Sequence, residues 1–125
     1  MAIRSVLVVE DDMSTRKLLE RRLEQQGYKV TAVADGHTAV SLVPEIFPNL
    51  ILMDILLPDM DGAEAVRMIK DDPRFKGIPV IFISSMISEG DPGHLKIVVS
   101  DVSYQAIPKP INFDKLWEAI KQLKK

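Results

Sequence analysis

Residues 50–54 read Leu-Ile-Leu-Met-Asp, four apolar residues followed by one aspartate. Two similar apolar runs occur elsewhere, Val-Leu-Val-Val at residues 6–9 and Val-Ile-Phe-Ile at residues 80–83. A strand that is apolar at every position is buried on both faces, as in a parallel sheet with helices on each side. The three runs therefore predict strands of a parallel sheet in the interior of the protein.

Segments with helical periodicity separate these runs. Apolar residues at helical spacing predict a helix after the first run, namely Met13, Leu18, Leu19 and Leu23. A second such helix is predicted at the end of the chain, with Asn112 as a favourable N-cap. Its apolar residues are Phe113, Leu116, Trp117, Ile120 and Leu123. Shorter helices are expected over residues 38–43, where Pro44 ends or kinks the helix, and over residues 63–70. A second strand is expected over residues 28–34.

Alternation of strands and helices predicts a doubly wound α/β fold. The pattern is weakest over residues 86–105, where Gly90, Pro92 and Gly93 interrupt it. The apolar run over residues 95–99 fits a helix or a strand, and we expect a helix there. The 125 residues contain no repeat and no interdomain linker, so one domain over residues 1–125 is expected.

Composition excludes several classes of protein. The absence of cysteine excludes disulfides, thiolate metal sites and thiol catalysis. A net charge of -2 without a basic cluster argues against binding of nucleic acid by this chain. The N-terminal apolar run meets three acidic residues instead of the longer apolar core of a signal peptide, and no run approaches the ~20 residues of a membrane span. A cytoplasmic protein is therefore expected.

Polar residues follow the predicted strands at the edge where an α/β sheet binds ligands. Three acidic residues (Glu10, Asp11 and Asp12) follow the first run, Asp54 the third, Ser84 and Ser85 the fourth, and Lys109 lies between two prolines after the short run Ala106-Ile107. Clustered carboxylates repel one another and need a cation. Oxygen ligands without Cys or nearby His favour Mg²⁺ or Mn²⁺, and the chemistry that fits is phosphoryl transfer to Asp54.

Each of these residues also has an ordinary structural explanation. Acidic residues after a strand are common at helix N-termini, and serines commonly cap a following segment. Asp54 fits a turn, and Lys109 fits an exposed loop. The coincidence of all four groups at one edge of the sheet favours a functional site over these separate explanations.

The motifs VLVVEDD, LILMDILLPDMDG, PVIFISS and IPKP, in this order and spacing, resemble the receiver domain of bacterial two-component response regulators over nearly the whole chain. The resemblance implies a (βα)5 flavodoxin-like fold, a five-stranded parallel sheet with strand order 2-1-3-4-5. It also implies that Asp54 accepts a phosphoryl group from a phosphohistidine of a sensor histidine kinase or a histidine phosphotransfer protein. The lysine–proline bond after Lys109 is typically cis in this family.

The same resemblance assigns roles to the other residues of the site. Asp11 binds Mg²⁺ directly, Glu10 binds it through water, and Asp54 and the backbone carbonyl of Leu56 are further ligands. Ser84 and Lys109 contact the phosphoryl oxygens. Their movement repacks the face formed by the fourth helix, fifth strand and fifth helix, where a downstream partner or a second receiver docks.

The sequence departs from the family in this same region. Ala106 takes the place of the usual aromatic residue three positions before the lysine, the nearest aromatic residue is Tyr104, and Ser100-Asp101-Val102-Ser103 replaces the common Gly-Ala-Asp. We therefore expect an atypical fourth helix, partly a loop. Leu56 and Met86 are apolar where polar residues favour hydrolysis, which predicts slow autodephosphorylation.

Other functions fit the sequence less well. A receiver-like module that binds proteins without phosphorylation usually lacks a site residue, whereas all are present here. An aspartyl-phosphate phosphatase needs a second carboxylate two residues after the nucleophile, where this chain has Leu56. A flavin carrier needs a hydroxyl-rich phosphate loop instead of three acidic residues, and a dinucleotide site needs a Gly-x-Gly-x-x-Gly motif.

Overall fold

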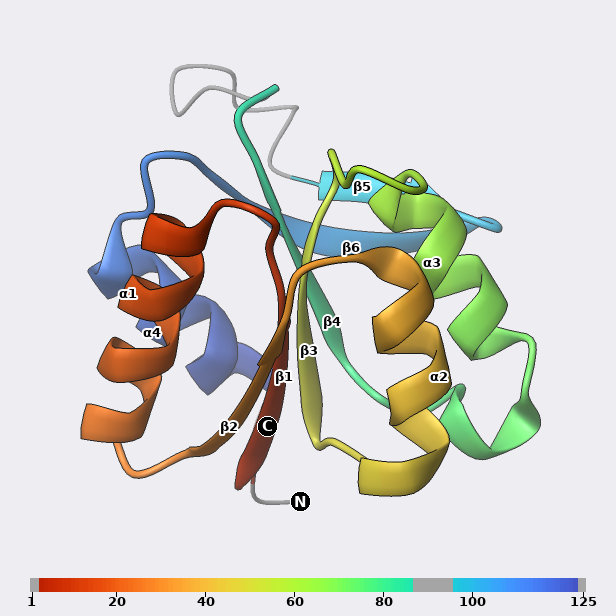
Figure 1. Ribbon diagram of the computed structural model, residues 1–125, viewed down its shortest axis with the longest axis horizontal. Helices are drawn as coiled ribbons and strands as arrows, with labels where there is room; N and C mark the ends of the chain where they lie inside the picture. Colours follow the sequence, from red (N-terminus) through yellow and green to blue (C-terminus); the bar gives the residue numbers. More distant parts are fainter. Residues whose placement is uncertain (1–2, 87–95, 124–125) are drawn as a thin grey trace.

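The computed structural model describes residues 3–86 and 96–123. Helices and strands alternate along most of the chain (Figure 1). The elements are β1 (Ser5–Val9), α1 (Met13–Gln25), β2 (Lys29–Val33), α2 (Gly36–Ile46), β3 (Leu50–Asp54), α3 (Gly62–Lys70), the 3-10 helix η1 (Pro73–Phe75), β4 (Val80–Ser84), β5 (Lys96–Val99), β6 (Val102–Pro108) and α4 (Phe113–Leu123).

One six-stranded sheet runs through the molecule in the order β2-β1-β3-β4-β6-β5. The pairs β1–β2, β1–β3, β3–β4 and β4–β6 are parallel, which confirms the predicted doubly wound parallel core and its strand order. The three apolar runs that predicted the sheet are β1, β3 and β4, and nearly all of their residues are buried. The carboxyl ends of the parallel strands consequently meet at one edge.

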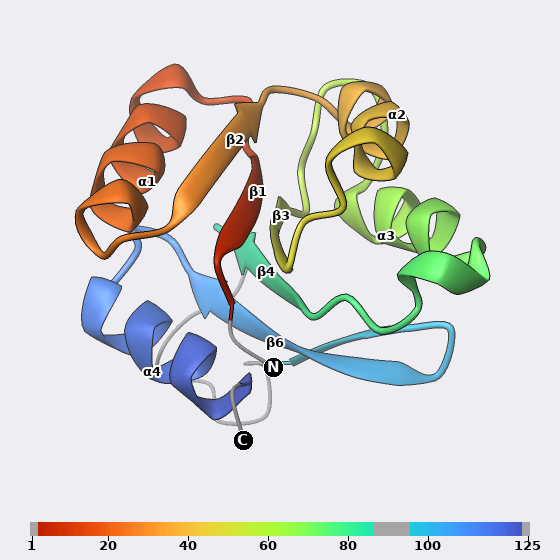
Figure 2. The same ribbon diagram turned by 90° about the horizontal axis from the view of Figure 1, so that it is seen from below.

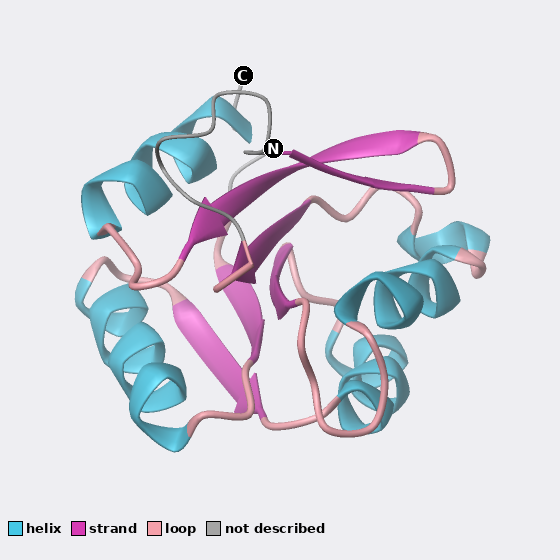
Figure 3. Ribbon diagram, turned by 90° about the horizontal axis from the view of Figure 1, so that it is seen from above, coloured by secondary structure: helices cyan, strands magenta, loops and turns pink. Residues whose placement is uncertain are grey.

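Helices cover both faces of the sheet. Figures 2 and 3 show α1 and α4 on one face and α2 and α3 on the other. Leu19 and Leu23 of α1 pack with Leu116 of α4 on the first face, while Ala65 and Val66 of α3 lie in the core of the second. The two apolar layers fix the sheet and thereby the positions of the loops at its edge.

The expected helix over residues 95–99 is wrong, because Lys96–Val99 form β5, while Leu95 lies outside the described residues. This strand pairs with β6 in antiparallel orientation, with Val99 opposite Val102. Ser100 and Asp101 connect the two strands with φ values of 49° and 66°, as a two-residue hairpin turn requires. Consecutive β-branched residues in β5 favour an extended strand over a helix.

The sheet therefore has one strand more than predicted, because β5 extends the predicted fifth strand, β6, at its outer side. The remainder of the expected atypical fourth helix, residues 87–95 with Gly90, Pro92 and Gly93, lies outside the described residues. Helices α1, α3 and α4 follow the prediction. Helix α2 is longer than expected, since Pro44 lies inside its last turns.

Side chains that precede the helices fix where each helix begins. Asp12, Asp35 and Asp61 each accept a hydrogen bond from a main-chain N–H in the first turn of α1, α2 and α3. The predicted cap Asn112 does the same for α4 through the N–H of Lys115. None of the helices in the described part of the chain has the length and apolarity needed to cross a membrane.

Candidate functional site

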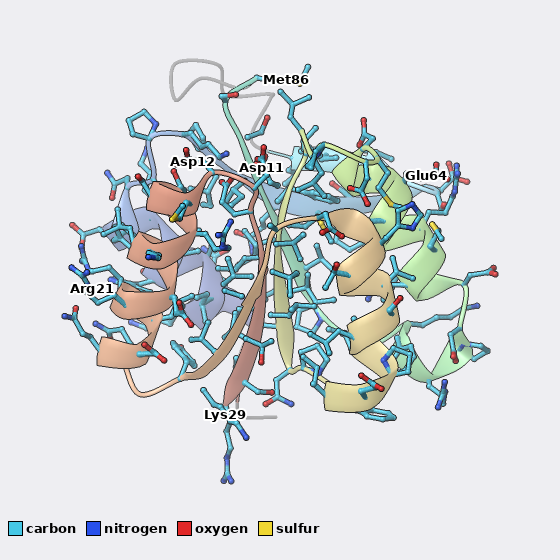
Figure 4. The ribbon with its side chains drawn as sticks, in the orientation of Figure 1. Asp11, Asp12, Arg21, Lys29, Glu64 and Met86 are labelled. Carbon is cyan, nitrogen blue, oxygen red and sulfur yellow. The ribbon has the colours of Figure 1, made fainter. Side chains whose placement is uncertain are left out.

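Three carboxylates meet where β1 and β3 end. One oxygen each of Glu10, Asp11 and Asp54 lies within 4.8 Å of the others. Glu10 and Asp54 are buried, at 0% and 2% exposure, whereas Asp11 is open to solvent. Figure 4 shows Asp11, Asp12 and Met86 at the same end of the sheet, opposite Lys29 at the start of β2. The sequence prediction that these carboxylates share one edge is confirmed.

Lys109 supplies the positive charge closest to this cluster. Its Nζ atom lies 2.9 Å from Oδ2 of Asp54 and 2.6 Å from Oε1 of Glu10. The contact with Asp54 is a hydrogen bond, whereas the buried Oε1 of Glu10 accepts no aligned hydrogen bond and its contact is the ion pair alone. The lysine therefore does not fully satisfy the buried carboxylates.

Burial and neighbouring charges shift the pKa values of Glu10 and Lys109. Burial raises the pKa of Glu10, and the nearby Asp54 adds to the increase, while Lys109 and the N–H of Asp12 oppose it. Burial tends to lower the pKa of Lys109, but its bonds with Glu10 and Asp54 outweigh burial and raise the pKa above 10.5. Lys109 is accordingly held in its charged form by the carboxylates that it contacts.

The donor set fits a metal ion. Three carboxylates face one ammonium group, which leaves excess negative charge if all are ionised, and one carboxylate oxygen of Glu10 has no aligned donor. A divalent cation among oxygen ligands compensates such a cluster. The acidic cluster can therefore bind a metal ion, and its arrangement resembles a phosphoacceptor site.

Ser84 lies at the end of β4, next to the strand that carries Asp54. The side chain is buried, and its Oγ accepts a hydrogen bond from the N–H of Met86, so the serine caps the local turn. Its main-chain carbonyl accepts from the N–H of Lys109. The bond from Lys109 to Pro110 is cis, as predicted from the family resemblance. Ser84 thus helps to hold the backbone from which the lysine reaches Asp54.

The loop after β3 depends on a glycine that the sequence analysis did not single out. The N–H of Gly62 donates to the carbonyl of Ile55 over 2.7 Å. A Cβ atom on Gly62 would lie 2.0 Å from the main-chain oxygen of Asp54, so no larger residue fits without movement. The predicted ligand residue Leu56 lies in this loop, and its N–H donates to Oδ1 of Asp54 over 3.3 Å. The role of its carbonyl stays a prediction.

Two further polar residues support the loops and were missed from the sequence. Arg16 donates from Nη1 to the main-chain carbonyls of Glu10 and Asp11. Asp59 accepts hydrogen bonds from the N–H groups of Gly36 and His37 at the start of α2, and these bonds lower its pKa. An arginine one helical turn after an acidic loop was the only sequence signal for the first contact.

Ala106 is buried opposite Phe82 in the register of β4 and β6. Tyr104, two residues earlier on the same face, packs its ring edge-on against Phe82 with 5.7 Å between centroids. The position where the family usually has an aromatic residue is thus filled by a methyl group. The aromatic residue nearest to this position along β6 is Tyr104, which lies farther from Lys109 in the strand than Ala106 does.

Comparison with known proteins assigns the family. The model of the response regulator receiver domain matches residues 6–121. The polar-differentiation response regulator DivK of Brucella ovis is 35% identical over 94% of this chain and 94% of its own length. The response regulator PleD of Caulobacter vibrioides is 38% identical over 69% of this chain, and that match spans 19% of PleD.

Solved structures agree with this assignment. A CheY-like response regulator receiver domain protein from Methanospirillum hungatei has a TM-score of 0.80 and 28% identity, with 98% of this chain and 95% of that chain covered. The chemotaxis protein CheY4 of Vibrio cholerae has a TM-score of 0.82 and 24% identity, covering 98% and 99% of the two chains, and shows the same fold. The chain belongs to the response regulator receiver domain family.

Proposed function

We propose that Asp54 accepts a phosphoryl group from a phosphohistidine of a sensor histidine kinase or a histidine phosphotransfer protein. The observation that carries this proposal is the buried Asp54 carboxylate, which lies 2.9 Å from the ammonium group of Lys109 and beside Glu10 and Asp11. A carboxylate oxygen forms the new bond to phosphorus as the phosphorus–nitrogen bond breaks. The histidine nitrogen keeps the electron pair of that bond.

The neighbouring residues would stabilise the charge on the transferred group. Lys109 is placed to neutralise a phosphoryl oxygen, and the Ser84 hydroxyl is proposed to donate a hydrogen bond to another. In the unphosphorylated chain its Oγ accepts a hydrogen bond from the N–H of Met86, which leaves the hydroxyl proton free to donate to a phosphoryl oxygen. Added charge of about -1.5 to -2 would draw both residues toward Asp54, and this movement is the proposed conformational signal.

Glu10, Asp11, Asp54 and the backbone carbonyl of Leu56 would hold Mg²⁺, with Mn²⁺ as a substitute. When bound, such an ion neutralises phosphoryl oxygens and offsets the repulsion among the carboxylates. The incompletely satisfied Glu10 and the three converging carboxylate oxygens support this assignment.

The receiver would act on its own aspartate instead of turning over a separate substrate. It would catalyse its own phosphorylation and a slow dephosphorylation. Leu56 and Met86 support slow loss of the phosphoryl group, since both are more than half exposed at the edge of the site and neither offers a group that orients water.

We also propose that the signal reaches a downstream protein or a second receiver in the cytoplasm through the face that includes β6 and α4. Lys109 directly follows β6, so movement of the lysine acts on this strand first. The predicted face also included a fourth helix, whereas the described part of this region contains β5. This difference favours, as a second candidate, a receiver-like module that binds proteins without phosphorylation.

Acetyl phosphate as a small phosphodonor separates the two candidates. Intact mass should reveal one acid-labile phosphoryl adduct that requires Mg²⁺, disappears in Asp54→Asn and persists in Asp12→Asn. Asp12 is a suitable control because it lies in the same acidic sequence but caps α1, a role that asparagine retains. Absence of the adduct in folded wild-type protein at saturating Mg²⁺ would favour the module that works without phosphorylation.

A further inference from the structure

A cleft separates α3 from the β5–β6 hairpin, at a distance along β6 from the phosphoacceptor site. Its volume is about 380 Å³, within the range of about 300–1,000 Å³ typical of ligand sites. The cleft is lined by Arg67, Lys70, Asp71, Lys76, Val99, Ser100, Val102 and Tyr104. None of these residues belongs to the carboxylate cluster or its lysine.

Positive charge in the cleft is only partly compensated. Arg67 forms an ion pair with Glu64 on the same helix. Lys70 and Lys76 form no ion pair with a carboxylate of the described residues, and Asp71 is the one acidic residue of the lining. Lys70 is half-buried and donates instead to the main-chain carbonyls of Lys76 and Ile78.

The half-buried Lys70 has a lowered pKa in this environment. Burial lowers the pKa of its ammonium group to about 8, and within residues 3–86 and 96–123 no carboxylate pairs with it to offset the loss of hydration. A negatively charged group in the cleft would restore part of the lost stabilisation of this ammonium. The chemistry of the cleft thus favours an anionic occupant at the Lys70 and Lys76 end.

The hairpin adds apolar surface beside these cations. Val99, Val102 and Tyr104 line the cleft, and Val102 is 49% exposed. Contiguous apolar surface rimmed by polar residues marks sites that other proteins contact. The cations and valines together match a segment that carries both acidic and apolar residues.

A second hollow continues the cleft along α3. It has a volume of about 340 Å³ and shares Arg67, Val99 and Ser100 with the first. Its remaining lining is Asp61, Ala63, Glu64 and Val98, so its charge differs from that of the first hollow. Figure 4 shows Glu64 on α3, on the side of the molecule where Figure 1 places β5. The two hollows share part of their lining and form one groove, in which the carboxylates of a bound peptide are expected only near Lys70 and Lys76.

We propose that the groove between α3 and the β5–β6 hairpin binds an extended segment of a partner protein, with its acidic residues at Lys70 and Lys76 and its apolar residues against the hairpin valines. The geometry and the charges of the groove carry this inference, which does not depend on phosphorylation of Asp54. It places a protein-binding surface on the hairpin that replaces the expected helix.

The test uses two synthetic peptides of the same shape, acetyl-Val-Thr-Phe-Asp-Glu-Asp-amide and acetyl-Val-Thr-Phe-Asn-Gln-Asn-amide. Each is titrated into the unphosphorylated full chain while amide signals are followed by nuclear magnetic resonance. The acidic peptide should shift Val99, Ser100, Val102 and Lys70 in a saturable manner and bind at least about five-fold more tightly than the neutral peptide. Raised salt should weaken this preference.

Charge reversal locates the contact. Lys76→Glu should weaken binding of the acidic peptide about three- to ten-fold, and Lys70→Gln should also weaken it. Lys17→Glu, an equal change of charge on the exposed surface of α1, should leave binding unchanged. Equal affinity for both peptides, saturable shifts away from the hairpin alone, or an equal effect of Lys17→Glu and Lys76→Glu would overturn the proposal.

Discussion

The ammonium nitrogen of Lys109 lies 2.9 Å from Oδ2 of Asp54, although the two residues are 55 positions apart in the chain. The same nitrogen lies 2.6 Å from Oε1 of Glu10. One lysine therefore connects the end of β6 with the carboxylates at the ends of β1 and β3. Removing it leaves two buried carboxylates without their cation.

Lys109→Met should destabilise the protein by about 2–4 kcal/mol at pH 7, because breaking a buried ion pair leaves uncompensated charge. Urea denaturation measures this change. Adding Glu10→Gln in the same chain should recover part of the loss, since one of the stranded carboxylates is then removed. Lys17→Met on exposed α1 is the control, and an equal loss in that variant would contradict the explanation.

Leu56→Asn combined with Met86→Glu should accelerate loss of the phosphoryl group from Asp54. Both wild-type side chains are exposed at the edge of the site, so polar replacements can orient water there. Intact mass over time, after removal of the phosphodonor, gives the rate. Leu18→Asn, which changes an exposed leucine on α1, should leave the rate unchanged. An unaltered rate in the double variant would refute the prediction of slow hydrolysis from these residues.

Gly62→Ala should destabilise the protein by about 2 kcal/mol or more, since the new methyl group meets the main chain of Asp54. Gly77→Ala provides a matched control because a Cβ atom there has no neighbour within 4 Å. That control should be neutral or stabilising by up to about 1 kcal/mol. The urea midpoints of the two variants measure the difference. Similar midpoints would show that a small movement relieves the clash between a methyl group at position 62 and the main chain of Asp54.

Lys70 should make the protein more stable as pH rises from about 8 towards 10.5, the usual pKa of lysine. In this interval the unfolded chain binds the proton that the folded chain has released, so stability increases with pH. The other charged groups that line the same cleft are Arg67, Asp71 and Lys76, and Tyr104 is a further titratable group there. These groups are present in both wild type and Lys70→Gln. The difference between the unfolding free energies of the two proteins therefore isolates the contribution of Lys70. A difference that is constant with pH would exclude a lowered pKa.

The hairpin turn predicts a stabilising change. Ser100 and Asp101 both have positive φ, a conformation that Asn-Gly adopts more readily. The double change Ser100→Asn and Asp101→Gly should therefore stabilise the protein by about 0.5–1 kcal/mol. Ser103→Gly, which places glycine inside β6, should instead destabilise it. Thermal unfolding compares the two variants. A double change that does not raise the melting temperature would argue against this turn.

The strands of the parallel core were predictable because their evidence is local. Residues 6–9, 50–53 and 80–83 are apolar throughout, and only burial on both faces explains such runs. The strand β5 has a shorter apolar run, the three residues 97–99 after Lys96, and so short a run does not distinguish a strand from a helix. Its pairing with β6 and the two positive φ values decide its structure, and neither can be read from periodicity.

The convergence of Glu10, Asp11, Asp54 and Lys109 followed from the topology, because each lies at or just after the carboxyl end of a parallel strand. The contacts of Arg16 and Asp59 did not follow. Both side chains bind main-chain groups, whose directions depend on loop conformation instead of residue type. The hydrogen bonds of these two side chains to backbone atoms are therefore the part of the site that could not be predicted from the sequence.

Both outer strands of the sheet begin with an exposed lysine, Lys29 in β2 and Lys96 in β5. Outer strands expose unpaired main-chain groups that can join the edge of another sheet, and a lysine charge at such an edge opposes this association. The additional strand β5 thus moves the exposed edge outward without leaving it uncharged. These two lysines oppose pairing of the sheet with another molecule at either side, although neither takes part in the chemistry at Asp54.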